Sequence, residues 1–303
     1  MQSNPRVPFM LSDRQPRLSP PDGKHLIVHI VVNLEYWPFD QPTPRSIVVP
    51  PHGRPNIPDL PNYCWAEYGV RCGMPRLLAL LSERALPVTA SVNASALEVY
   101  PAVAERMLAL EWEFIGHGIQ QRALNHEDEE GAVIEAALAR LARFTGRRPR
   151  GWMSPGWTET FRTPDLLHQA GVRYVCQWVI DDVPTWLTTA SGHLVALPYG
   201  LDLNDSVVFA IEKHSSDEMA TRIRSTIEVF EEEIRATGQV RILTIPLHPH
   251  LSGVPHRLQQ LRAVIDQLRA RDDTIFMNGS QIYDWFLEQG VAPPPVTAPG
   301  EPA

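Results

Sequence analysis

The chain has 303 residues, of which 44% are hydrophobic, and it carries 27 Lys and Arg against 35 Asp and Glu, for a formal net charge of −8. This acidic balance, without a long basic run, argues against a nucleic-acid partner. No apolar run approaches the roughly 20 residues of a membrane span, and Met1–Pro21 lacks the pattern of a secretion signal. The three cysteines form no C-x-x-C pair. We therefore expect a cytoplasmic protein with no membrane partner.

Apolar, β-branched runs alternate with amphipathic segments along the chain. We expect strands at 25–34, 87–93, 113–115, 151–153, 174–178, 195–198, 241–247 and 275–277. We expect helices at 73–86, 101–110, 127–145, 163–170, 216–237, 255–270 and 280–288. This alternation is typical of a parallel sheet with right-handed crossovers. The sequence therefore predicts an α/β protein with a (β/α) barrel of about seven parallel strands.

The rest of the chain surrounds a single predicted domain at residues 25–289. Residues 1–24 are expected to form an irregular arm, and the proline-rich residues 290–303 a disordered tail. Residues 38–61 are too long and too polar for a plain connector, so we expect a lid over a site or an oligomer contact.

Three of the expected strands end in ionisable residues, namely Glu35, His117 and His248. The carboxyl ends of the strands of a parallel barrel open onto one face, where such enzymes place their chemistry. His117 lies between Gly116 and Gly118, which permit close approach and are hard to explain by packing alone. The alternative interpretation of Glu35 is a solvated acid in a loop. We predict that these three residues form a catalytic group.

Five further residues are candidates for substrate binding. Asn93 either donates to a substrate carbonyl or merely ends its strand. Trp37 and Trp157 either wall a planar substrate or pack in the core. Asp182 either lines the pocket or serves a turn, and His250 either meets the substrate or pairs with a carboxylate.

An oxygen-rich cluster lies further along the chain, at Asp202, Asn204 and Asp205. Such a cluster suits a hard cation. Its spacing differs from that of a calcium-binding loop, which favours a structural turn.

The ordered motifs resemble the polysaccharide-deacetylase (NodB-homology) superfamily over roughly residues 25–289. The motifs are the first-strand acid and the segments Ser91–Ala94, Glu113–Gly118 and Leu247–Pro249. A closer resemblance is to a cytoplasmic branch of allantoinases, cyclic imide hydrolases and peptidoglycan-deacetylase-like proteins. It is carried by Asn33–Tyr36, Asp181–Pro184, Pro198–Asp205 and His248–Gly253. The resemblance implies a deformed (β/α) barrel, hydrolysis of a non-peptide C–N bond and a homotetramer.

The chain departs from the metal-dependent members of that superfamily. Those proteins have an Asp-Asp pair after the first strand and His-x-x-x-His after the third. Here the first acid is Glu35, and Gln121 stands where the second histidine would fall. Because a zinc site needs three protein ligands, we prefer a site without a cofactor. In the alternative, Glu35 and His117 bind Zn²⁺ or another divalent metal, with His126 or Asp182 completing the site.

We therefore predict a hydrolase of a small cyclic amide, imide or ureide. Glu35 would activate water, His117 would bind the carbonyl oxygen or share the proton, and His248 would act as general acid or stabilise the oxyanion. Two alternatives remain at this point. One is a metal-dependent deacetylase of N-acetylated sugars, and the other is an inactive barrel that serves as a binding or assembly protein.

Overall fold

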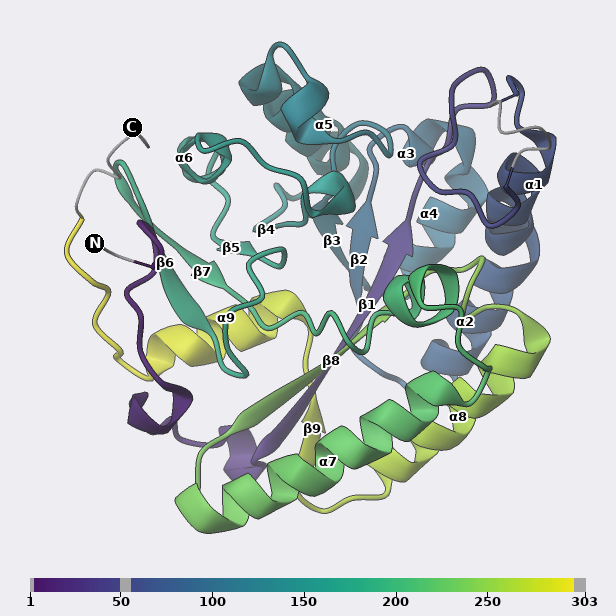
Figure 1. Cartoon of the computed structure of the whole chain (residues 1–303). Coiled ribbons are helices and arrows are strands. Elements are labelled where there is room, and N and C mark those ends of the chain that lie inside the picture. Colours follow the sequence, from purple (N-terminus) through teal and green to yellow (C-terminus); the bar gives the residue numbers. More distant parts are fainter. Residues whose placement is uncertain (1–2, 50–55, 297–303) are drawn as a thin grey trace.

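The strands form one curled sheet in the computed structural model, which describes residues 3–49 and 56–296. In this part the strand order is β6-β7-β5-β4-β3-β2-β1-β8, with β9 against β1. Every pair is parallel except β6 with β7. The strands are β1 (Leu26–Leu34), β2 (Thr89–Val92), β3 (Glu113–Gly116), β4 (Gly151–Trp152), β5 (Tyr174–Val175), β6 (Thr185–Thr189), β7 (Gly192–Ala196), β8 (Arg241–Leu247) and β9 (Thr274–Phe276). The sheet curls like part of a barrel (Figure 1), which confirms the predicted α/β class and deformed barrel in one domain.

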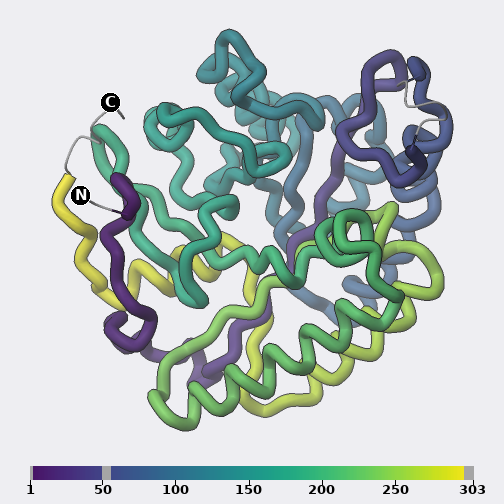
Figure 2. The backbone as a smooth tube through the Cα atoms, viewed as in Figure 1, coloured from purple at the N-terminus to yellow at the C-terminus, as the bar shows by residue number. Residues whose placement is uncertain are grey.

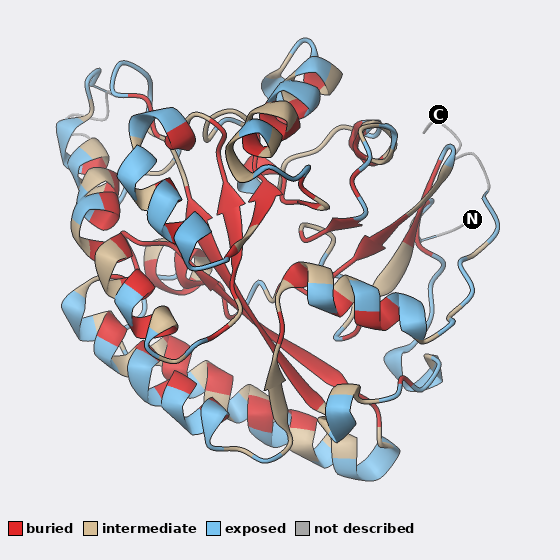
Figure 3. Cartoon of the chain, turned by 180° about the vertical axis from the view of Figure 1, so that it is seen from behind, coloured by how far each residue is buried: buried red, intermediate tan, exposed pale blue. Residues whose placement is uncertain are grey.

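Helices pack around this sheet and are exposed on their outer sides (Figure 3). They are α1 (Leu60–Tyr68), α2 (Met74–Ser82), α3 (Ala96–Val99), α4 (Pro101–Ala109), α5 (Glu130–Thr145), α6 (Thr163–Gln169), α7 (Glu218–Thr237), α8 (Pro255–Arg269) and α9 (Gly279–Glu288). The long helices α5 and α7 end at Gly146 and Gly238, with φ of 75° and 66°. Glycine adopts this left-handed conformation without strain, which is why these two helix ends were predictable.

Several elements differ from the expectation, among them α1 and β6. Helix α1 begins inside the segment 38–61 that we expected to be a loop, and the π-helical turn Gly69–Gly73 joins α1 to α2. Pro61 lies in the first turn of α1, where proline is favoured, and the Asp59 side chain caps that turn. Strand β6 also falls where no strand was expected, and it pairs with β7 as an antiparallel hairpin.

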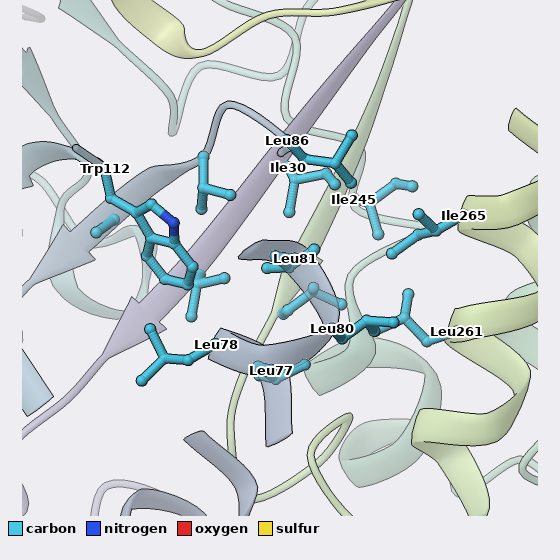
Figure 4. Close-up of a cluster of buried hydrophobic side chains, with 14 of the residues drawn as sticks. Ile30, Leu77, Leu78, Leu80, Leu81, Leu86, Trp112, Ile245, Leu261 and Ile265 are labelled. Carbon is cyan, nitrogen blue, oxygen red and sulfur yellow. The ribbon is translucent and has the colours of Figure 1, made fainter. Parts of the chain in front are cut away.

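Side chains alternate between two faces along β1. The even-numbered residues from Leu26 to Leu34 belong to the core between sheet and helices, whereas Ile27 and Val31 belong to the core inside the curl. Figure 4 shows the outer core, where leucines of α2 meet Ile30 of β1 and Ile245 of β8. Because the period of a strand is two, odd-numbered residues of β1 project toward the interior of the barrel.

Both ends of the described chain lie beside the β6–β7 hairpin (Figure 2). Buried Arg6 pairs with Asp165 at 2.8 Å and donates to Thr188 O. On the other side, Trp186 Nε1 donates to Val291 O at 2.9 Å. The boundaries 1–24, 25–289 and 290–303 stay predictions, and residues 1–2, 50–55 and 297–303 lie outside the described part. Within that part, no helix has the length and apolar character to cross a bilayer.

Candidate active site

Strand register brings the predicted catalytic residues to one end of the sheet. Leu34 of β1 pairs with Val92 of β2, and Val92 pairs with Gly116 of β3. Glu35, Asn93 and His117 each follow this row directly. On the other side of β1, Val32 pairs with Leu247, so that His248 follows the end of β8. All of these residues lie at the carboxyl ends of parallel strands, as predicted.

Glu35 is the centre of the group. Its Oε1 atom lies 3.8 Å from His117 Nε2 and 3.5 Å from His248 Nε2, and its side chain is 9% exposed. Its Oε2 atom accepts a hydrogen bond of 2.8 Å from Trp37 Nε1. Burial would raise the pKa of Glu35, but the two imidazoles outweigh it and hold that pKa well below its usual range. Glu35 is therefore an ionised base with one oxygen fixed and the other facing the histidines.

The His117 ring is oriented by the backbone of Met153, the residue that follows β4. Its Nδ1 atom lies 2.6 Å from Met153 O, which can only accept, so Nδ1 carries a proton. In the neutral ring Nε2 then bears a lone pair, and this buried atom has no hydrogen-bond partner within the described residues. A neutral His117 would accept a hydrogen bond from water. The predicted alternative, donation to a substrate carbonyl, would require its protonated form.

His248 is held by Asp205, a fully buried carboxylate that sequence reasoning had assigned to a turn. Asp205 Oδ1 lies 2.6 Å from His248 Nδ1, and Oδ2 accepts from His248 N and Ser252 Oγ, each at 2.7 Å. Burial lowers the pKa of His248, but the charges of Asp205 and Glu35 raise it to about 10. His248 is thus an imidazolium near neutral pH, with Nε2–H directed toward Glu35.

These groups open into a pocket of about 110 Å³. Its residues are Asn33, Glu35, Trp37, Pro44, Arg45, His117, Gln121, Met153, Ser154, Gly156, Trp157, Tyr199, Asn204, Ser206, His248 and His250.

Of the predicted binding residues, Trp37, Trp157 and His250 line this pocket. Trp157 packs edge-on against Tyr199, with ring centroids 6.3 Å apart. His250 is buried between Trp37 and Trp65, and burial lowers its pKa to about 4, so its ring is neutral. Gly69 and Gly73 allow this wall to form, because a side chain at either position would collide with the backbone of His250 or Pro249.

Two of the predicted binding residues make other contacts, which agree with the alternatives of a strand end for Asn93 and a turn for Asp182. Asn93 does not line the pocket. Its Oδ1 accepts from Tyr36 N at 2.9 Å and its Nδ2 donates to His117 O, so it ties two loops together. Asp182 lies beside the start of β8, where its backbone carbonyl accepts a hydrogen bond from Ile242 N. His248 follows the far end of that seven-residue strand, about 20 Å away.

The residues present do not fit a metal centre. Within 3–49 and 56–296, no group of three or more His, Cys, Asp or Glu side chains is arranged to hold an ion. Asn33 Nδ2 donates hydrogen bonds to Tyr199 Oη and Leu247 O. His126 is exposed, and neither His126 nor Asp182 lines the pocket. The preference for a site without a metal stays a prediction.

Comparisons with known proteins agree with this fold. Residues 63–175 match the family model described as polysaccharide deacetylase. A Schizosaccharomyces pombe protein named "Putative polysaccharide deacetylase" is 26% identical over 239 residues, which cover 71% of this chain and 73% of that protein. The crystal structure of Puue allantoinase superposes with a TM-score of 0.81 at 24% identity, over 91% of this chain and 94% of the other.

A probable polysaccharide deacetylase from Pseudomonas aeruginosa gives a TM-score of 0.79 at 24% identity, over 91% of this chain and 95% of that one. At these identities the two crystal structures show the fold. Taken with the domain match at residues 63–175 and the curated relative, they agree with the resemblance predicted from the motifs. Residues 63–175 thus match a polysaccharide-deacetylase domain, and the chain shares the fold of these structures.

Proposed function

We propose that the protein hydrolyses a C–N bond in a small cyclic amide, imide or ureide, with Glu35 as general base and His248 as general acid. The observation that carries this proposal is the buried Glu35 carboxylate between two imidazoles, one of which Asp205 keeps charged. The broader class rests on the family itself: the chain is a hydrolase acting on C–N bonds other than peptide bonds.

The proposed step begins with a water between Glu35 and His117. The water donates one hydrogen toward Glu35 Oε1 and the other toward His117 Nε2. As its oxygen attacks the substrate carbonyl, Glu35 takes the first proton. His248 Nε2–H stabilises the oxyanion and then protonates the leaving nitrogen as the C–N bond breaks. The products are a carboxylic acid and a free amide or amine, and the proton on Glu35 restores His248.

Tyr199 adds a donor for the oxyanion. Its hydroxyl oxygen accepts from Asn33 Nδ2 at 3.2 Å, and its hydrogen has no acceptor within the described part of the chain. Burial raises the pKa of Tyr199 above its ordinary value, so the phenol keeps its proton. A neutral donor fixed in a buried site stabilises developing charge more than one in water does.

A second candidate, deacetylation of an N-acetylated sugar, is favoured by the deacetylase match over residues 63–175. The two are separated by offering the purified protein two kinds of substrate, with and without a chelator. One is a panel of cyclic amides, imides and ureides, both neutral and carboxylate-bearing, and the other is an N-acetylglucosamine oligomer. We expect chelator-resistant opening of rings and its loss in Glu35→Gln. Chelator-sensitive release of acetate with no ring opening would overturn the proposal in favour of the deacetylase.

The remaining alternative, an inactive binding or assembly protein, is tested by His117→Ala. Loss of turnover with an unchanged circular dichroism spectrum supports the enzyme. The cytoplasmic location and the homotetramer stay proposals that rest on the resemblance, and size-exclusion chromatography with light scattering tests the tetramer.

A further inference from the structure

Arg45 gives the candidate pocket a second charge. Apart from the histidines, the charged residues that line the pocket are Glu35 and Arg45. Glu35 is nearly buried, whereas Arg45 is half-buried and therefore lies nearer to solvent. Within residues 3–49 and 56–296, the Arg45 side chain makes no ion pair or hydrogen bond. A guanidinium beside a pocket with no protein partner is available to a ligand.

The segment that carries Arg45 is held on both sides of it. Thr43 Oγ1 donates to Asp59 Oδ2 at 3.1 Å. After Arg45, the backbone nitrogens of Ile47 and Val48 donate to Asn62 Oδ1 at 2.8 and 3.0 Å, and Asn62 is fully buried. Asp59 and Asn62 belong to the start of α1. The position of Arg45 is therefore fixed by a helix end and does not depend on a free loop.

We propose that the substrate carries a carboxylate, and that Arg45 binds this group while the ring carbonyl faces Glu35. This inference rests on the proposed function and specifies its substrate class. The planar fork of arginine matches a carboxylate with two parallel hydrogen bonds. The Glu35 carboxylate repels a second negative charge, so an anionic group is driven to the Arg45 end. Opposite charges within one small pocket thus fix which end of the ring meets the base.

A matched ligand pair tests the inference: (2,5-dioxoimidazolidin-4-yl)acetate and its neutral primary amide, which has the same shape. We expect the wild type to prefer the carboxylate by about 10- to 100-fold in kcat/KM, the range of a hydrogen bond to a charged group. Arg45→Gln removes this preference and Arg45→Lys keeps part of it. Arg71→Gln, the same change on exposed Arg71 in the adjoining turn, leaves the preference intact.

The outcomes separate the two proposals. Equal turnover of carboxylate and amide by the wild type overturns the role of Arg45 but leaves ring hydrolysis in place, as does an unchanged preference in Arg45→Gln. If the wild type opens neither ring, the proposed function fails for this pair, and calorimetric affinities of the same two ligands decide. If the wild type binds the carboxylate more tightly than the amide and Arg45→Gln abolishes this difference, the anion-binding role of Arg45 is still supported. Equal affinities of the wild type for the two ligands overturn that role.

Discussion

Asp205→Asn is the sharpest test of the electrostatics of the site. Asp205 and Glu35 together raise the pKa of His248 from 6.5 to about 10, against the opposing effect of burial. Because one pKa unit corresponds to about 1.4 kcal/mol, this difference amounts to about 5 kcal/mol in favour of the imidazolium. Asparagine at position 205 keeps the shape but removes the nearer charge. Burial then prevails, and we expect His248 to be mostly neutral at pH 7.

The expected kinetic result is a loss of roughly 10²- to 10⁴-fold in kcat/KM at pH 7, the usual contribution of a general acid. In the wild type the alkaline decline in kcat/KM should come near pH 10, and in Asp205→Asn it should move below pH 7. The exposed Asp202 of the same turn provides the control, since Asp202→Asn should leave the profile unchanged. An identical alkaline limb in wild type and Asp205→Asn would refute the assignment of His248 as the acid.

The same substitution should change the pH dependence of stability. The folded-state pKa of His248 is raised, so its charge stabilises the fold fully below about pH 6.5, and this stabilisation is lost as the pH rises toward 10. The free energy of unfolding of the wild type should therefore exceed that of Asp205→Asn most at acidic pH, and the gap should narrow above pH 6.5. Urea denaturation over this range measures the gap. A gap that stays constant contradicts the argument.

Three other substitutions address single contacts. Trp37→Phe removes the donor to Glu35 Oε2 and should lower kcat by about 10-fold, whereas Trp65→Phe, which alters the same aromatic wall without that bond, should not. Tyr199→Phe should lower kcat by about 10- to 100-fold with little change in KM, if its hydroxyl acts only in the transition state. Asn93→Ala should cost about 1–3 kcal/mol in urea denaturation, because it leaves Tyr36 N and His117 O without their buried partner.

The grouping of the three proposed catalytic residues was predictable because each of them follows its own strand. Glu35, His117 and His248 needed only the rule that parallel strands end on one face. Asp205 was not predictable in its role, since it reaches His248 across 43 residues through a loop whose course no local pattern sets. Arg45 escaped notice for a similar reason, because its place depends on the unexpected start of α1.

For Asp182, the sequence indicated the turn correctly but not its place in the fold. Its neighbours Asp181 and Pro184 were typical of a turn near a strand, and the prediction placed that turn at the catalytic end. The chain in fact returns past the start of β8 before it enters β6, and this route brings Asp182 beside Ile242. Local turn chemistry identifies a turn but not the end of the sheet at which it lies.

The interior face of β3 shows why position alone does not make a residue functional. Glu113 and His117 share this face, but Glu113 accepts hydrogen bonds from Thr89 Oγ1, Tyr174 Oη and Ser280 N, the last from the start of α9. Those three donors satisfy both of its oxygens and close the amino end of the barrel. At the other end, His117 Nε2 has no hydrogen-bond partner among the described residues, and His117 lines a pocket. The two ends of this face therefore differ, because a bound ligand or water in the pocket can complete the hydrogen bonding of His117 Nε2.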